Sequence, residues 1–190
     1  MEKYIQHIDS ESHFAIKLLS KNQVQIILAP SSEINYKHST IKVPNLSIPL
    51  EKEKYIIIQS DWSDTKDNWY DYYFLNISIS SKPSGIKLEK VKGLKDLSIT
   101  GNHFTFHLGA ITQISKVILF EHTHKSSTEF VQYDAALLII LENNKKILIS
   151  HVDDITGYLE IYYHEADIEA KIEVLKPRLV FKNGSRDQSI

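Results

Sequence analysis

Apolar and polar side chains alternate along most of the chain, and this alternation limits the fold more than any other feature of the sequence. Residues 75–79 and 104–108 carry apolar side chains at every second position, with polar side chains between them. Successive side chains of a β-strand point to opposite faces, so these segments predict strands with one buried and one solvent-facing side. Residues 135–141 are apolar throughout, which predicts a central strand covered on both faces.

Strand signals of this kind recur from end to end and predict an all-β fold, either an antiparallel sandwich or a partly closed barrel. Residues 14–18 and 24–28 alternate on either side of a polar turn, which predicts an early hairpin. Helical spacing of apolar residues is found in 164–176, ahead of Pro177, although the same segment also alternates. We therefore expect at most one short helix, near residues 164–176.

The chain carries a faint internal duplication. A shift of 63 positions lays residues 63–77 on residues 126–140 with six identities, among them Tyr70 with Tyr133 and Asp71 with Asp134. The similarity of the flanks predicts two related β units, 55–99 and 118–161, within one domain of residues 1–184 and ahead of a flexible tail, 185–190. We interpret the shared aspartate as a structural acceptor of loop amides. A paired acid–base role for Asp71 and Asp134 is the weaker alternative.

Composition excludes several classes of function. The net charge of −2 lacks the basic field of a nucleic-acid-binding protein. The absence of cysteine excludes disulfides, a thiol nucleophile and cysteine-ligated metals. The longest apolar run, 135–141, is far shorter than the roughly 20 residues that span a bilayer, so no membrane partner is expected. The chain opens without an export signal, and we expect a cytoplasmic location.

The sequence contains none of the common catalytic or phosphate-binding motifs, so no cofactor and no catalytic residue are predicted. His122 and His124 are two positions apart and would point to one face of a strand, a spacing that some metal-binding β-proteins use. A metal-dependent enzyme of the cupin-like type, built on these two histidines and a further ligand, is therefore an alternative. The nine histidines otherwise lack a defined spacing, so we predict no stoichiometric transition metal.

Residues 61–71 have the most unusual local composition of the chain. They include both tryptophans, an adjacent tyrosine and several carboxylates, and the candidate ligand-binding residues are Trp62, Trp69, Tyr70, Asp61, Asp64 and Asp67. Aromatic faces supply a large rigid contact area and also stack on sugar rings. The matching segment of the second unit, 126–132, has no tryptophan, so the architecture of the unit does not require these rings.

We therefore predict a non-enzymatic binding or protein-interaction module that uses the aromatic, acidic loop 62–73. At least one tryptophan should be exposed beside the aspartates, and the partner should be a protein or a small polar ligand such as a saccharide. A structural or assembly protein that associates through its sheet edges is a further alternative, and homo-oligomer formation is left open. The lysine-rich segment 82–95 is interpreted as a solvated edge that resists strand pairing.

Overall fold

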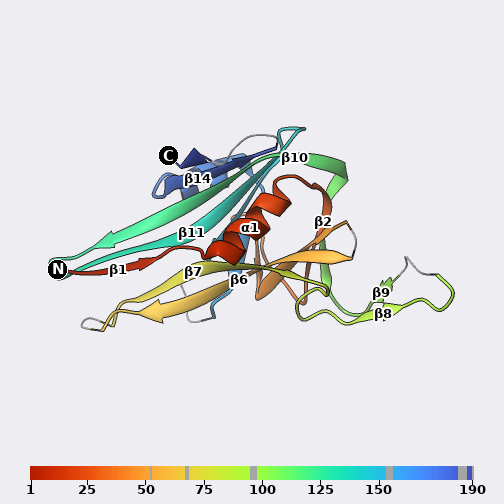
Figure 1. Ribbon diagram of the computed structural model, residues 1–190, viewed down its shortest axis with the longest axis horizontal. Helices are drawn as coiled ribbons and strands as arrows, with labels where there is room; N and C mark the ends of the chain where they lie inside the picture. The colour runs from red at the N-terminus through yellow and green to blue at the C-terminus, as the bar shows by residue number, and fades with distance from the viewer. Residues whose placement is uncertain (52, 67–68, 95–97, 153–155, 184–187, 190) are drawn as a thin grey trace.

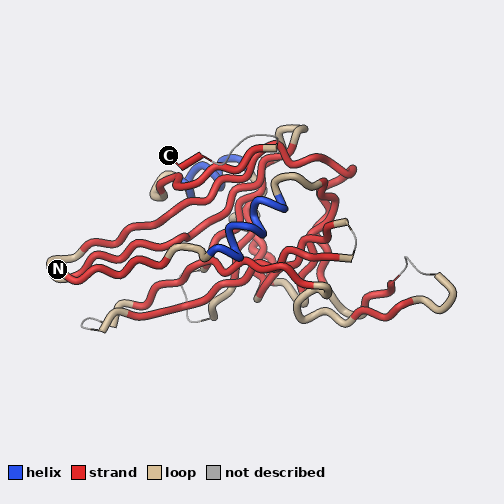
Figure 2. Tube along the Cα trace, in the orientation of Figure 1, coloured by secondary structure: helices blue, strands red, loops and turns tan. Residues whose placement is uncertain are grey.

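The computed structural model describes residues 1–51, 53–66, 69–94, 98–152, 156–183 and 188–189. Strands dominate this part of the chain, and two helices accompany them (Figure 2). The elements in chain order are β1 (Glu2–Gln6), α1 (Ser10–Leu19), β2 (Gln23–Ala29), β3 (Glu33–Asn35), β4 (Thr40–Val43), β5 (Asn45–Leu50), β6 (Lys54–Asp64), β7 (Asp71–Ser80), β8 (Leu88–Lys90), β9 (Ser98–Thr100), β10 (Phe104–Lys125), β11 (Glu129–Leu141), β12 (Lys146–His151), β13 (Leu159–Tyr162), α2 (Glu165–Ile172), β14 (Lys176–Lys182) and β15 (Gln188–Ser189).

Thirteen of the described strands form one continuous sheet, in which the order along the main path is β3-β4-β13-β12-β11-β10-β2-β5-β6-β7. Strand β10 joins two halves of this sheet, because its first part pairs with β2 and its later part pairs with β11 and β14. The described pairs are antiparallel except for β1, which runs parallel to β11. Strands β8 and β9 form a separate two-stranded sheet.

The two halves of the sheet pack on one main hydrophobic core. Its fully or almost fully buried members include Ile58 and Leu75 from one half, Leu137 and Ile139 from the other, and Ile16 from α1. Helix α1 lies between the halves, beside β7 (Figure 1). The path ends at β3 and β7, which do not pair with each other among the described strands, so the sheet does not close into a barrel. The all-β prediction is confirmed, in the form of a sandwich.

Strand β11 confirms the prediction of a central strand covered on both faces. Leu137 belongs to the main core, whereas Leu138 belongs to a second cluster on the opposite face, where Ile168 of α2 is buried. Every residue of the run 135–141 is buried except Ile140, which is half-buried. This pattern follows from alternation, because neighbouring side chains of a strand face opposite layers.

The predicted early hairpin is wrong in its first strand, because residues 10–19 form helix α1. Asp9 caps this helix, accepting a hydrogen bond from the Ser12 amide at 2.8 Å. The helix buries Ser12, Ala15, Ile16 and Leu19, at helical spacing. The expectation of at most one short helix is therefore also wrong. Helix α2, within the predicted segment 164–176, is confirmed.

The predicted duplication places two long hairpins, β6–β7 and β10–β11, in corresponding positions of the sequence. Their registers differ, because Ser63 pairs with Tyr72 while the equivalent Ser126 lies in the turn after β10. The duplication stays a prediction. At the end of the chain, β15 pairs with β14, and residues 185–187 and 190 lie outside the described residues. Neither described helix is long and apolar enough to cross a membrane.

Candidate functional site

The ends of the β6–β7 and β10–β11 hairpins lie together at one end of the molecule, next to β1 (Figure 1). The Tyr70 ring stacks on the His124 ring, with centroids 4.1 Å apart and planes nearly parallel. Behind this pair, Tyr72 stacks on Tyr133 at 5.5 Å. Because both contacts join the first hairpin to the second, the two ends form a single surface. We call it the tip surface, and define it as residues 61–66, 69–71 and 124–129.

Thr65 organises the loop that carries the tryptophan nearest to the hairpin turn. Its side chain is fully buried, its amide donates to the Tyr70 carbonyl, and its hydroxyl accepts from the Tyr70 amide, both at 3.1 Å. Its carbonyl accepts from the Trp69 amide, also at 3.1 Å. These bonds hold Trp69 at a φ of 51°, a conformation that bulky residues rarely adopt. The Trp69 ring is therefore presented to solvent by a constrained backbone, and the residue is 75% exposed.

An open groove of about 540 Å³ runs between the two hairpin ends. Its lining residues are Trp69, Tyr70, Asp71, His124, Ser126, Ser127, Thr128 and Glu129. The far wall is a tight polar turn, in which the Ser126 hydroxyl accepts hydrogen bonds from the amides of Thr128 and Glu129 at 3.3 and 3.0 Å. The groove thus combines one exposed indole with hydroxyl, imidazole and carboxylate groups.

Two carboxylates of the tip surface occupy directly opposite positions in the antiparallel β6–β7 pair. Asp64 of β6 pairs directly with Asp71 of β7, and Trp62 pairs with Tyr73 one step further along the same face. Like charges directly opposite in an antiparallel pair destabilise the sheet, so this arrangement does not serve folding. It concentrates negative charge next to an aromatic side chain instead.

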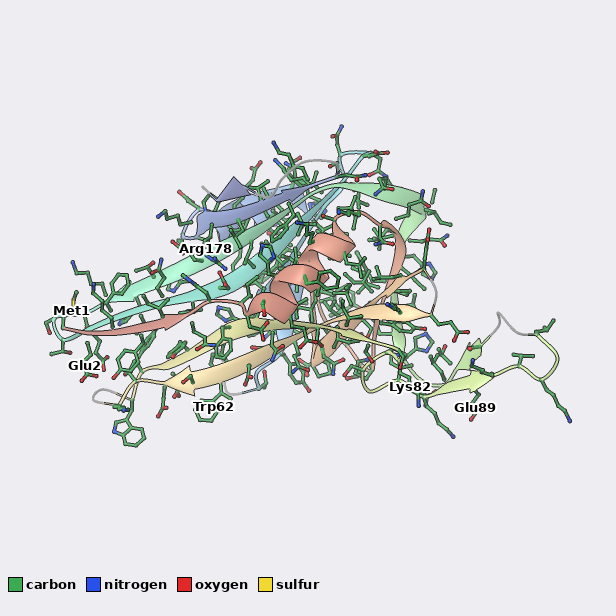
Figure 3. All side chains as sticks on the ribbon, in the orientation of Figure 1. Met1, Glu2, Trp62, Lys82, Glu89 and Arg178 are labelled. Atoms are coloured by element: carbon green, nitrogen blue, oxygen red, sulfur yellow. The ribbon has the colours of Figure 1, made fainter. Side chains whose placement is uncertain are left out.

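The predicted exposure of the tryptophans is confirmed for both rings. Trp62 is 61% exposed and lies on the outer side of the hairpin, on β6 (Figure 3). Asp61 is also exposed, and its carboxylate accepts a hydrogen bond from the Trp62 amide at 2.9 Å. Asp67 lies outside the described residues. Asp61, Trp62 and Asp64 thus lie on the last residues of β6, on the same hairpin as Trp69 and Tyr70.

The two histidines of the metal alternative face aromatic rings. His122 lies against Tyr133, with ring centroids 5.4 Å apart, and His124 stacks on Tyr70. Among the described residues, no group of three or more histidine and carboxylate side chains is arranged to hold a metal ion. The geometry therefore adds no third ligand to this pair in the part of the chain that the structure describes.

Asp71 and Asp134, the other candidate pair, have different surroundings. Asp71 is exposed in the groove, whereas Asp134 is fully buried, where it accepts hydrogen bonds from the Ile8 amide and from Arg178. The contacts of Asp134 agree with its interpretation as a structural acceptor.

Sequence reasoning missed the second half of the tip surface. The sequence patterns indicate other chemistry for Asp71 and His124, and they give no reason to include the turn 126–129 in the site. No local signal links residues 69–71 to 124–129, because their proximity depends on the packing of one hairpin against another. Comparison of the chain with protein-family models, curated proteins and solved structures finds no match.

Proposed function

We propose that the chain is a non-enzymatic binding module, and that its contact surface is the tip surface. The observation that carries this proposal is the exposure of both tryptophans at one end of the molecule, beside Asp61, Asp64 and Asp71. Large aromatic side chains dominate the energetics of protein interfaces when a partner covers them. Two exposed indoles in one small region are therefore best explained by a partner.

The tip surface carries the exposed lysines Lys66 and Lys125 as well as carboxylates, and it is the paired carboxylates of Asp64 and Asp71 that favour a positively charged group of a protein partner. A lysine or arginine placed between Asp64 and Asp71 would relieve the repulsion between these paired carboxylates. The same cation would lie near Trp62, and cations bind favourably to the face of an indole. A basic segment of a protein supplies both contacts at once.

The surface is also held in place before a partner arrives. The Thr65 hydrogen bonds fix the loop, and the stacking of Tyr70 on His124 joins the two hairpin ends. Binding to such a surface needs less ordering of side chains and loops, so more of the contact energy remains as affinity.

A small polar ligand such as a saccharide is the second candidate, and the groove favours it. Trp69 offers a face for stacking, while Asp71, His124 and the turn 126–129 offer hydrogen-bonding groups around it. Sugar rings bind through this combination of an aromatic face and polar side chains.

Tryptophan fluorescence tests both candidates, because the only two tryptophans of the chain lie on the tip surface. We expect oligolysine to change the emission in a saturable manner, and oligoglutamate to leave it unchanged. Trp62→Ala and Trp69→Ala, followed by calorimetry, should each weaken oligolysine binding by about tenfold or more, as hot-spot residues do. Tyr36→Ala is the matched control, since Tyr36 is an aromatic residue that is 87% exposed outside the tip surface.

The outcomes separate the candidates. Equal responses to oligolysine and oligoglutamate would contradict a charge-selective surface. A response to maltohexaose or chitohexaose that depends on Trp69, without a response to oligolysine, would instead identify the groove as a saccharide site. No saturable response to any of these probes, by fluorescence or by calorimetry, would leave the tip surface without a binding role.

A further inference from the structure

The β8–β9 hairpin projects from the body at the end of the molecule opposite to the tip surface (Figure 1). Its strands pair with each other in a separate sheet. We call residues 86–94 and 98–100 the arm. An isolated two-stranded hairpin is only marginally stable in water, so a projecting arm is a feature that folding of the core does not require.

The arm combines positive charge with an apolar groove. The segment 82–95 contains five lysines and one glutamate, and Lys87, Lys90 and Lys92 are exposed. A groove of about 520 Å³ on the arm is lined by Lys90, Val91, Gly93 and Leu94. Leu94 is 55% exposed there. The arm therefore presents a small apolar depression with ammonium groups at its margin.

The tip surface presents the complementary chemistry. It offers exposed indole rings with carboxylates beside them, while the arm offers an apolar groove with lysines beside it. A single copy cannot join its own tip to its own arm, because the two lie at opposite ends of the longest axis (Figure 1). We propose that the tip surface of one copy binds the arm of a second copy. This inference rests on the proposed function and names the partner of that surface.

In this contact the Trp69 ring occupies the groove beside Val91 and Leu94, and burial of these apolar surfaces supplies the attraction. The carboxylates of Asp64 and Asp71 face the ammonium groups of Lys90 and Lys92. Lys90 lies 3.4 Å from Glu53 within its own chain, but both side chains are largely exposed, so this weak pair exchanges readily for the new one.

A tip-to-arm contact is heterologous, so each copy keeps one free tip and one free arm and association continues into rings or open chains. Two hairpin ends bury little surface, which places the interface in the weak, concentration-dependent class. Opposite charges at its margin also make it sensitive to salt, since the screening length falls from about 10 Å at 0.1 M to about 3 Å at 1 M.

Sedimentation equilibrium of the purified chain tests the proposal, at low and high salt and at concentrations up to about 0.5 mM, as a weak interface requires. We expect the average mass to rise with concentration at low salt and to fall back at high salt. The arm variant Lys90→Glu/Lys92→Glu and the tip variant Asp64→Lys/Asp71→Lys should each weaken association by about a hundredfold, because each places like charges together. Lys21→Glu/Lys182→Glu changes the net charge by the same amount as the arm variant, at exposed positions outside both surfaces, and should associate like the wild type.

The decisive measurement is sedimentation of an equimolar mixture of the arm variant and the tip variant. Trp69→Ala serves as a further comparison. The arm variant keeps an intact tip and the tip variant keeps an intact arm, and their reversed charges are opposite in sign, so an equimolar mixture should associate although neither variant does so alone. Circular dichroism spectra that match the wild type establish that both variants are folded. A mixture that stays monomeric, or a wild type that stays monomeric at low salt, overturns the proposal. If oligolysine still binds the tip in that case, the proposed function stands and its partner is another protein.

Discussion

At the scale of single residues, a buried group of charges ties three segments of the chain together. Glu121 of β10 and Asp134 of β11 are direct cross-strand partners, and both are buried. Two carboxylates in this position are tolerated only with cations nearby. Arg178 donates to both oxygens of Asp134, at 2.7 and 2.6 Å, while His7 and Lys176 each lie 3.6 Å from Glu121. Arg178 and Lys176 come from β14 and His7 from the segment after β1, so these contacts hold both segments to the sheet.

Replacement of Arg178 by methionine should be strongly destabilising, because it leaves the Asp134 carboxylate buried without its bidentate partner. We expect the free energy of unfolding to fall by about 3 kcal/mol, the usual cost of breaking a buried ion pair. Urea denaturation measures it, with Lys182→Met as the control on an exposed lysine of the same strand. The double variant Asp134→Asn/Arg178→Met should recover part of the loss. A single variant within 0.5 kcal/mol of the control, on the scale that surface substitutions show, would mean that the pair is dispensable.

The candidate site illustrates which residues a sequence can identify. Trp62 and Trp69 stood out because a tryptophan-rich polar loop has no counterpart in the second hairpin, and this reasoning is local. His124 is distinguished in the sequence only by its spacing from His122. Its contact with Tyr70 depends on how two hairpins pack against each other, and local patterns do not encode that packing.

At the scale of elements, residues 10–19 show how a period-two pattern can mislead. Phe14, Ile16 and Leu18 alternate, but the side chains that α1 buries completely are Ala15, Ile16 and Leu19. Phe14 is 58% exposed, so its apolar character was the misleading feature. The signal that distinguishes the two interpretations was the capping residue Asp9, three positions before Ser12. The strand β11 was predicted correctly, because an apolar run of its length bounded by polar turns fits few other environments.

The cap of α1 supplies a pH-dependent prediction. The hydrogen bond from the Ser12 amide holds the pKa of Asp9 below its ordinary value. A carboxyl with a depressed folded-state pKa stabilises the fold above its unfolded pKa, and that contribution is lost as the pH falls through the folded pKa. Asp9→Ala should therefore destabilise the protein by about 1 kcal/mol at neutral pH, and the difference from the wild type should shrink in acid.

Urea denaturation between neutral pH and the acidic limit of folding provides the measurement. Asp9→Asn is the matched control, since asparagine also caps helices but does not ionise. Its stability should lie close to that of the wild type at neutral pH. A difference between wild type and Asp9→Ala that stays constant down to the lowest pH would assign the effect to packing and not to the ionised cap.

At the scale of the whole molecule, the sandwich depends on β10, which belongs to both halves of the sheet. Register shifts occur between His107 and Thr112 and between Ile114 and Lys116, where the strand passes from one half to the other. The alternation of residues 104–108 predicted a strand there but not its length or its two sets of partners. Those partners, β2 and β11, lie on either side of β10 in the chain, and their order in the sheet is a long-range property that alternation does not record.

Gly109 lies in the part of β10 where the strand passes from one half of the sheet to the other, and it has a φ of +101°. A Cβ at this position would approach only the end of a flexible side chain, Lys145 Nζ, at 3.4 Å, so the backbone conformation is the main obstacle to any other residue. Gly109→Ala should therefore lower the free energy of unfolding by about 1–3 kcal/mol, the cost of one strained residue. Because both halves share one core, this loss should appear in the single cooperative transition of the whole protein.

Gly93→Ala is the matched comparison, since Gly93 has a similar φ of +88° and an added Cβ would meet nothing within 4 Å. Gly93 lies in the arm, outside the shared core, so its strain should act on local opening of the arm and leave the global unfolding midpoint unchanged. Urea denaturation followed by far-ultraviolet circular dichroism reports the global transition, and hydrogen exchange of the arm amides reports local opening. Equal shifts of the midpoint in both variants would show that the arm unfolds together with the sandwich. Backbone strain at Gly109 would then affect global stability no more than strain at Gly93.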